Sequence, residues 1–505
     1  MQGFWGLQGE FILSMKIKKP YIIFCLSGLA LGLACSSERN FPSIGKSWSG
    51  PSAVEVSSDG QNFYVQNSDF GWVYNSGSIV TLNEAGDKLA ALEAPRLGSG
   101  LKIVTYQGRQ RLIGIYDIQS KNADGYVQTY DLTDQAAPVQ EFSVGIACSP
   151  LKIIAEDSYR YFFVACTGGN LYVGDLESSS LEMKLIRSYG RTRRAWHLSV
   201  SKQLLVGFPT DLGRQGSEDR RVEDIKTFSS TGEETSGANE VPDLFEDTKE
   251  SRRQRRLRSL YQFVVMDLAT ESSAGFPLRN LGDSEDSTAT LEARWLYFNL
   301  FDADGQPDNS DDLKTKDFKN YRTNFFEASP HPTDSNSFYL SHRGVTAAST
   351  NVVKVSFLGP SLVPVDAVDG VCGENTNLVE DKCVPTTESI LNFKRVYGFN
   401  SEVDDLHYPG MIESVVLGEQ EVLIVNHFRD FANWDQDKVR FSVAAKIVGQ
   451  DSVKAISFDS TSQDFSIYGF AINSSGVLMA PAYYGDAVIR MVVEPNSIQA
   501  PERKE

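Results

Sequence analysis

The sequence is poor in positive charge. It has 48 Lys and Arg residues against 66 Asp and Glu residues, which gives a formal net charge of −18 over 505 residues. A protein that binds nucleic acid through its surface shows a basic footprint, so this balance argues against a nucleic-acid partner. The hydrophobic fraction of 41% is nevertheless ample for a packed core.

An apolar run long enough to span a membrane is missing from the N-terminal region. The run Pro20–Ala34 is 15 residues long, whereas a membrane-spanning helix needs about 20. Three lysines just before it and small residues at its end are typical of a signal peptide. We therefore expect residues 1–34 to be removed on export, with Met15 as the natural start.

The end of this run resembles a bacterial lipobox. The segment Leu31–Cys35 ends in a small residue followed by Cys, although Gly32 stands where the family usually has Leu. The resemblance implies that Cys35 is diacylated, becomes the first residue after cleavage, and anchors the chain in the lipid bilayer; more than one acyl chain is needed for stable anchoring. The serines at 36 and 37 imply an outer-membrane lipoprotein that faces the periplasm or the cell surface. The alternative is a cut after Ala34 that releases a free periplasmic protein.

Cysteine is scarce beyond this point. Four cysteines remain, namely Cys148, Cys166, Cys372 and Cys383. An even number in an exported protein indicates disulfides. The alternative, a zinc site, would need tighter Cys and His spacing. We predict the bonds 148–166 and 372–383.

Catalytic motifs and helical periodicity are absent as well. Neither His-Glu-x-x-His nor Gly-x-Ser-x-Gly occurs, and the five histidines are widely spaced. Isolated surface or turn histidines are therefore expected. Almost no stretch shows the 3.6-residue spacing of an amphipathic helix.

Short β-rich runs recur instead, broken by Asp, Gly, Ser and Asn. Asn62–Gln66, Arg111–Tyr116 and Tyr161–Ala165 begin about 49–50 residues apart, which is near the period of a four-stranded blade. Each precedes a polar loop and a second run. This order resembles the blades of WD40-like and YVTN-like β propellers, although no Gly-His…Trp-Asp signature is present. The resemblance implies an all-β propeller of about seven four-stranded blades over residues 49–494. Two β-sandwich domains are the alternative.

Five segments fall outside the repeat. They are a lipidated linker at 35–48, expected insertions at 211–258, 271–325 and 358–396, and a C-terminal tail at 495–505.

The second insertion carries an alternation of carboxylates around a Gly turn. The residues are Asp302, Asp304, Asp308 and Asp311. Ca²⁺ takes six to eight oxygen ligands, and the segment is similar to the loops of EF-hand and thrombospondin-type calcium repeats. The resemblance implies a calcium site, with an exposed acidic loop as the alternative. Calcium is the one cofactor that the sequence suggests.

The loops that follow the middle runs would share one face of a propeller. Aromatic and Arg side chains among polar groups are typical of interface anchors, and simple turn chemistry is the alternative. The predicted binding face comprises Asp69, Tyr116, Asp117, His342, Arg343, His427, Arg429, Trp434, Tyr483 and Tyr484.

These features together predict an envelope-anchored, non-enzymatic binding or scaffold propeller with a protein partner in the envelope. The alternative is a periplasmic propeller hydrolase, lactonase or quinoprotein with a metal or cofactor at the channel mouth. Fold alone does not decide between the two.

Overall fold

The computed structural model describes 15 segments of the chain. They are residues 41–117, 124–188, 193–209, 264–280, 325–342, 351–357, 365–366, 376–379, 382–385, 391–398, 409–428, 441–449, 453–457, 469–482 and 486–495. The predicted calcium ligands and Cys35 lie outside these segments.

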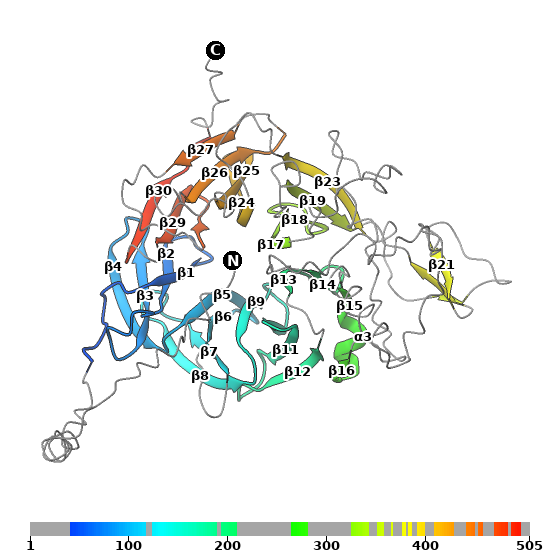
Figure 1. The fold of residues 1–505 in the computed structure, drawn as a ribbon, viewed down its shortest axis with the longest axis horizontal. Coiled ribbons are helices and arrows are strands. Elements are labelled where there is room, and N and C mark those ends of the chain that lie inside the picture. Colours follow the sequence, from blue (N-terminus) through cyan, green and yellow to red (C-terminus); the bar gives the residue numbers. More distant parts are fainter. Residues whose placement is uncertain are drawn as a thin grey trace, which may run out of the picture.

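Seven antiparallel sheets follow one another around a ring in these segments (Figure 1). Each sheet is a blade whose strands pair in chain order from the centre outward. A ring of such sheets is a β propeller, so the fold predicted from the sequence is confirmed and the alternative of two sandwich domains is wrong.

Blades 1 to 3 have four strands each in chain order, and blade 3 gains one more at its outer edge. The strands of blade 1 are β1 (Pro51–Val56), β2 (Asn62–Asn67), β3 (Gly77–Asn83) and β4 (Lys88–Ala94). Those of blade 2 are β5 (Gly98–Tyr106), β6 (Arg109–Tyr116), β7 (Gly125–Asp131) and β8 (Val139–Ile146). Those of blade 3 are β9 (Pro150–Ile154), β10 (Tyr161–Cys166), β11 (Asn170–Asp175) and β12 (Met183–Ser188).

Blades 5 and 6 also have four strands, whereas blades 4 and 7 have three each in the described segments. Blade 4 comprises β13 (Arg193–Ser199), β14 (Leu204–Pro209) and β15 (Val264–Asp267). Blade 5 comprises β17 (Phe325–Pro330), β18 (Ser337–His342), β19 (Asn351–Phe357) and β23 (Leu391–Gly398). Blade 6 comprises β24 (Pro409–Leu417), β25 (Gln420–Phe428), β26 (Phe441–Ile447) and β27 (Val453–Ser457). Blade 7 comprises β28 (Ala471–Ile472), β29 (Val477–Ala482) and β30 (Ala487–Val492).

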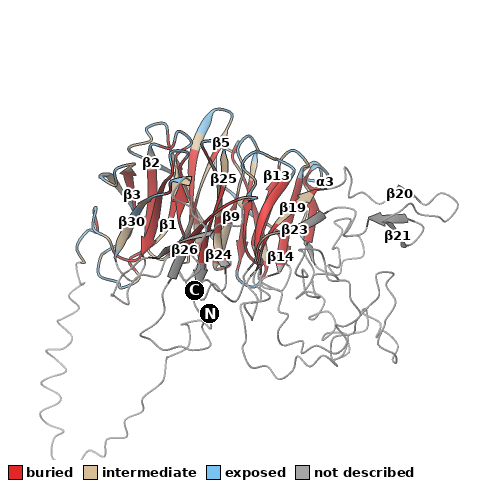
Figure 2. Ribbon diagram, turned by 90° about the horizontal axis from the view of Figure 1, so that it is seen from above, coloured by how far each residue is buried: buried red, intermediate tan, exposed pale blue. Residues whose placement is uncertain are grey.

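The second strand of a blade is covered on both of its faces. In β2 every position from Phe63 to Asn67 is buried (Figure 2). Strand β29 is also buried throughout, whereas the outer strand β4 is only partly covered. Successive side chains of a strand point to opposite faces, so both faces of the middle strands pack against neighbouring blades. This explains why the middle runs are apolar without alternation.

Within the described segments the core comprises seven clusters, and each lies between two neighbouring blades. For example, Phe163 of blade 3 packs with Trp196 of blade 4. The ring closes in the same way, because Phe63 and Val65 of blade 1 pack with Val477 and Met479 of blade 7. Burying apolar surface between blades therefore holds the ring together.

Hydrogen bonds reinforce this closure between the first and last blades. The Asn473 side chain donates to the Gly60 carbonyl at 2.9 Å, and the Gly50 amide donates to Asp486 at 2.6 Å. The described strands of blade 7 pair only with one another, so side-chain contacts rather than a shared sheet join it to blade 1.

The chain returns to blade 3 after blade 4. Helix α3 (Leu268–Ser273) is capped by the Asp267 side chain, and β16 (Arg279–Asn280) then pairs in parallel with β12. A buried ion pair of 2.8 Å between Arg187 and Glu271 joins the helix to that blade. The beginning of the predicted insertion 271–325 thus packs on the propeller.

A small three-stranded sheet lies apart from the ring in Figure 1. Its strands, in sheet order, are β20 (Val365–Asp366), β22 (Lys382–Pro385) and β21 (Thr376–Val379). They fall within the predicted insertion 358–396. Among the described residues, no helix has the length and apolar character needed to cross a membrane.

A disulfide joins Cys148 to Cys166, with their Cα atoms 6.0 Å apart. It ties the approach to β9 to the end of β10, inside the core between blades 2 and 3. This is one of the two bonds that the sequence predicts. Cys372 lies outside the described segments, so the bond 372–383 stays a prediction.

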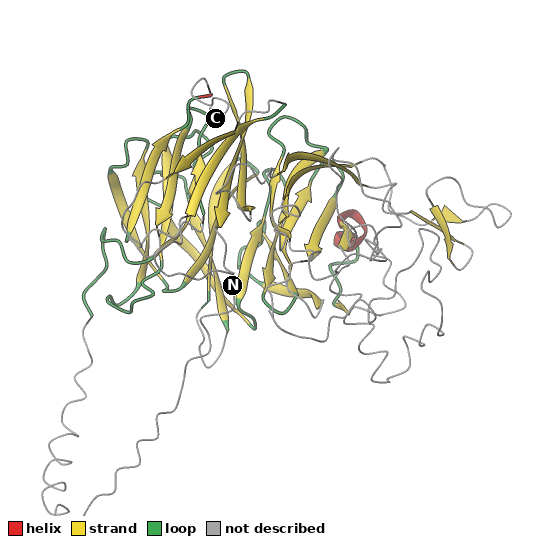
Figure 3. Cartoon of the chain, turned by 45° about the horizontal axis from the view of Figure 1, so that its top comes forward, coloured by secondary structure: helices red, strands yellow, loops and turns green. Residues whose placement is uncertain are grey.

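All blades run in the same order, so the ring has two distinct faces; Figure 2 shows the ring edge-on and Figure 3 shows it obliquely. We call the face where the second strands end the exit face. The residues at these ends are Asn67, Tyr116, Cys166, Pro209, His342, Phe428 and Ala482. We call the opposite face, which holds the turns between first and second strands, the turn face.

Candidate functional site

A central channel passes between the first strands of the blades. Its cavity has a volume of about 150 Å³ and is lined by β1, β5, β9, β13, β17 and β24 and by the residues just before β28. Seven charged residues line it and come from six different blades, namely Glu55, Lys102, Lys152, Glu156, Arg194, Glu327 and Glu413. The channel is thus polar although the strands around it are mostly apolar.

The lysines of the channel are paired with carboxylates of other blades. Lys102 of blade 2 lies 3.6 Å from Glu55 of blade 1, and this carboxylate raises the pKa of Lys102. Lys152 of blade 3 donates to Glu327 of blade 5, so this pair bridges two blades that are separated in the ring by blade 4. These pairs link blades and leave little net charge in the channel.

Three carboxyl groups of the channel have unusual surroundings. Burial raises the pKa of Glu156 to about 7. Burial raises the pKa of Glu413 to about 7, although Lys102 and Lys152 oppose this effect. The Glu327 side chain is only 3% exposed, and its second oxygen has no hydrogen-bond partner among the described residues. The channel could therefore offer an acceptor, and a group that titrates near neutral pH, to a ligand.

A second feature of interest is the loop between β2 and β3 on the exit face, residues 68–76, which we call the Trp72 loop. Its organiser is the Asp69 carboxylate, which is fully buried. One oxygen accepts from the Ser49 hydroxyl and the Val73 amide at 3.0 Å each. The other accepts from the Tyr74 amide at 3.1 Å and from Arg96 at 3.0 Å.

The loop presents two apolar side chains to solvent. Trp72 is 55% exposed and Val73 is 54% exposed, and the Arg96 guanidinium lies 4.6 Å from the centre of the Trp72 ring. Asp69 and Trp72 have positive φ angles of 44° and 53°, a region that residues other than glycine seldom adopt. Strained backbone of this kind persists only where the surroundings fix it and often marks a functional loop.

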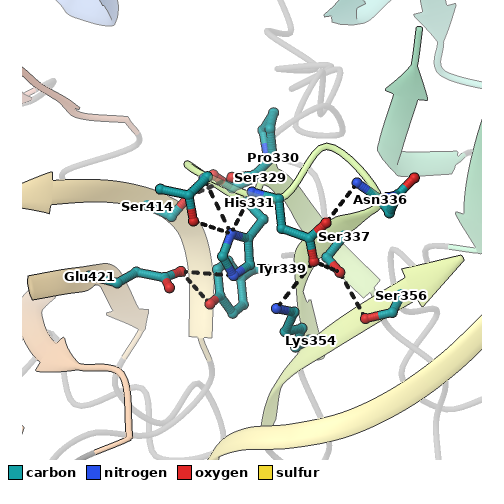
Figure 4. Close-up of polar contacts among 12 residues, drawn as sticks. Ser329, Pro330, His331, Asn336, Ser337, Tyr339, Lys354, Ser356, Ser414 and Glu421 are labelled. Atoms are coloured by element: carbon teal, nitrogen blue, oxygen red, sulfur yellow. Dashed lines mark hydrogen bonds and ion pairs between the residues drawn. The ribbon is translucent and has the colours of Figure 1, made fainter. Parts of the chain in front are cut away.

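A polar cluster joins blades 5 and 6 on the turn face (Figure 4). The Asp334 amide donates to Nδ1 of His331 at 3.2 Å, so the ring proton belongs on Nε2, which lies 3.3 Å from Glu421. Tyr339 donates to the same carboxylate and stacks on the imidazole. Burial lowers the pKa of His331, although Glu421 opposes this effect. The cluster thus holds a neutral histidine as a link between blades.

The structure describes only part of the predicted binding face. Asp69 and Tyr116 are buried, and the Tyr116 hydroxyl lies 2.6 Å from that of Tyr130. Both would act by holding loops rather than by touching a partner. Asp117 is half-buried, and burial raises its pKa. The remaining predicted residues have side chains outside the described set, namely His342, Arg343, His427, Arg429, Trp434, Tyr483 and Tyr484.

The predicted calcium ligands Asp302, Asp304, Asp308 and Asp311 also lie outside the described segments. Within those segments, no group of three or more His, Cys, Asp or Glu side chains is placed to hold a metal ion. The calcium site stays a prediction.

Sequence reasoning missed the channel charges and the Trp72 loop tip. A signal for the first was present, because Leu101-Lys102-Ile103 recurs as Leu151-Lys152-Ile153. One charged residue at an equivalent place in successive first strands indicates a shared polar environment. The signal for the second was an adjacent apolar pair, Trp72 and Val73, in a turn between two strands, where polar residues are usual.

Comparison with known proteins gives only distant similarities. No family model and no curated protein matches the sequence. The β-propeller domain of Myceliophteria thermophila Cps50 (Swd1) is 9% identical, with 89% of this chain and 99% of that chain covered and a TM-score of 0.46. A chain of the mitotic checkpoint complex is 8% identical, with 95% and 98% covered and a TM-score of 0.43. The periplasmic gluconolactonase PpgL of Pseudomonas aeruginosa is 12% identical, with 88% and 92% covered and a TM-score of 0.43. Such distant likenesses decide nothing about function, and the fold rests on the sheets described above.

Proposed function

We propose that this protein is an exported lipoprotein whose propeller binds a protein partner in the cell envelope and catalyses no reaction. The observation that carries the proposal is the disulfide between Cys148 and Cys166. Disulfides persist in oxidising compartments and are rare in the bacterial cytosol. This bond supports export, and the lipobox-like segment that ends at Cys35 supports anchoring.

The channel chemistry favours binding over catalysis. Both lysines of the lining lie against carboxylates, so these pairs serve first to join blades across the channel. A rigid ring with one loop-rich face is suited to presenting anchors to a partner. The partner surface is expected on the exit face, where the sequence places Arg429 and Trp434.

Replacing the lipidated cysteine tests the anchoring. Wild-type protein should pellet with membranes after a salt wash, and mass spectrometry of its N-terminal peptide should show acyl groups on Cys35. The variant Cys35→Ser should be released into the soluble fraction. If the variant still pelleted after the salt wash, the anchor would be wrong.

A pull-down from native membranes tests the binding. The variant Trp434→Ala should lose the partner that wild type captures. Val139→Ser is the matched control, because Val139 is 63% exposed and lies at the turn-face end of β8, where it pairs with Asp131. Equal capture by wild type and Trp434→Ala would contradict a partner at that place on the exit face.

One observation favours a second function. Burial raises the pKa of Glu413 to about 7, and one oxygen of Glu327 in the same cavity has no partner among the residues that the structure describes. This is the setting of a general acid or base. A hydrolase with its site in the channel would lose activity in Glu413→Gln. Assaying wild type and this variant against lactone and ester substrates, with metal content measured alongside, separates the two functions.

A further inference from the structure

We infer that the Trp72 loop rests on the surface of the lipid bilayer and sets the orientation of the propeller there. The inference deepens the proposed function, because it rests on the acylation of Cys35. The loop tip is apolar, and no described part of the chain covers it, because Trp72 and Val73 are each more than half exposed. The bilayer is what contacts this tip.

The first argument is the reach of the anchor. The described chain begins beside the loop, because the Phe41 ring lies 5.5 Å from the Arg96 guanidinium and the Asn75 amide donates to the Pro42 carbonyl at 3.1 Å. Phe41 is six residues from Cys35. An extended chain spans at most about 3.6 Å per residue, so these six residues reach about 20 Å. The acylated residue therefore stays within about 20 Å of the place where the chain meets the loop.

The second argument is chemical. Tryptophan is enriched at membrane–water interfaces, where its ring lies at the level of the headgroups. The loop 68–76 has one carboxylate, Asp69, and this group is fully buried and paired with Arg96. The chain as a whole has a net charge of −18, so most of its surface would be repelled by anionic lipid. The loop tip lacks a free negative charge and can approach such a surface.

The third argument is rigidity. The four hydrogen bonds to Asp69 fix the loop in its strained conformation before any contact is made. Pre-ordered side chains lose little conformational entropy on binding. A short tether and a fixed tip together give the propeller two points of contact with the membrane, which restricts how it can tilt there.

A protein partner at the loop is the rival occupant. We favour the bilayer because the chain that leads from the acylated residue meets the propeller at this loop. The anchor therefore holds the loop near lipid in the presence or absence of a protein partner. By contrast, the exposed Val139 lies at the turn-face end of β8, on the other side of the ring, and serves as the internal control.

Trp72 fluorescence provides the test. Acylated full-length protein is reconstituted into vesicles of phosphatidylethanolamine and phosphatidylglycerol, with or without bromine on the acyl chains. Subtracting the emission of Trp72→Phe from that of wild type isolates the signal of Trp72. We expect this signal to be blue-shifted in vesicles and to lose most of its intensity with brominated lipid. The tryptophan introduced by Val139→Trp in the Trp72→Phe background should be unaffected.

The outcomes separate the inference from the proposed function. If Cys35 is acylated and the protein sediments with the vesicles, but the Trp72 signal is not quenched, the inference is overturned and the anchor stands. If no acyl group is found on Cys35, both fail. If the Trp72 signal ignores brominated lipid but shifts when solubilised envelope proteins are added, the loop binds protein and the inference is also overturned.

Discussion

Replacing Asp69 by alanine should destabilise the protein by about 3–5 kcal/mol. The carboxylate is fully buried and accepts four hydrogen bonds, one of them from the guanidinium of Arg96, whose side chain is 16% exposed. Removing one partner of a buried ion pair costs about 3–5 kcal/mol, because the other charge is left without compensation.

Simple addition of the four bonds would overstate this loss. Hydrogen bonds to charged groups contribute about 1.5–3 kcal/mol each, which would sum to roughly twice the value given above. The Val73 and Tyr74 amides belong to an exposed loop, so water can replace the carboxylate for them. The Arg96 guanidinium is less accessible to water, so the loss of its carboxylate partner contributes most of the destabilisation. Asp69→Asn keeps the shape and some of the bonds and should cost less than Asp69→Ala.

Denaturant unfolding of wild type, Asp69→Ala and Asp69→Asn measures the loss, and limited proteolysis shows whether the Trp72 loop opens. Faster cleavage between residues 68 and 76 is expected for Asp69→Ala. A matched control is Asp131→Ala, because Asp131 also pairs with an arginine, Arg109, but at the surface. Exposed pairs contribute about 1 kcal/mol or less. The reasoning would be refuted if the two alanine variants were equally stable.

Three further predictions concern the channel, the disulfide and the first insertion. Burial raises the pKa of Glu413 to about 7 from about 4.3 in an unfolded chain, so the folded state holds its proton more tightly and stability falls as pH rises from about 4.3 to about 7. Glu413→Gln should remove this fall and be more stable than wild type by up to about 4 kcal/mol at pH 8 but not at pH 4, because one pKa unit corresponds to about 1.4 kcal/mol; denaturant unfolding at both pH values measures the difference. Replacing Cys148 and Cys166 together by serine should cost about 3 kcal/mol, and a reductant should lower the melting temperature of wild type but not of the variant. A short Gly/Ser linker in place of residues 211–258 should change stability by less than about 1 kcal/mol, because β14 and β15 on either side are neighbours in one sheet; a drop of many degrees in thermal unfolding would contradict this.

The fold could be predicted because the repeat is local. Runs such as Arg111–Tyr116 and Tyr161–Ala165 are buried almost throughout in the structure, and a middle strand covered on both faces is mostly apolar. The first three runs are spaced by about one blade length, and this repeat, together with the resemblance to known propeller blades, predicted the number and kind of sheets. The pair Cys148 and Cys166 was predictable for the same reason, since both cysteines belong to one repeat.

The contacts between blades could not be predicted in this way. The Lys152–Glu327 pair joins residues 175 positions apart, and the Asn473–Gly60 bond joins residues 413 apart. Such partners meet only when the ring closes. A single charged residue in an apolar first strand, such as Lys102, predicts that the strand lines a polar channel. It does not predict which charged residue of another blade it pairs with.

The sequence by itself determined the strands, the blade repeat and the cysteines of one blade, because each depends on residues close together in the chain and on the alternation of side chains along a strand. Only the tertiary structure decided that the Asp69 carboxylate is buried and holds the Trp72 loop by hydrogen bonds. It also decided that the Trp72 side chain is exposed and that Glu413 lies inside the channel. The burial of a polar residue is set by what packs over it. In a ring of sheets, that neighbour comes from another blade or from the N-terminal arm, and no local pattern records it.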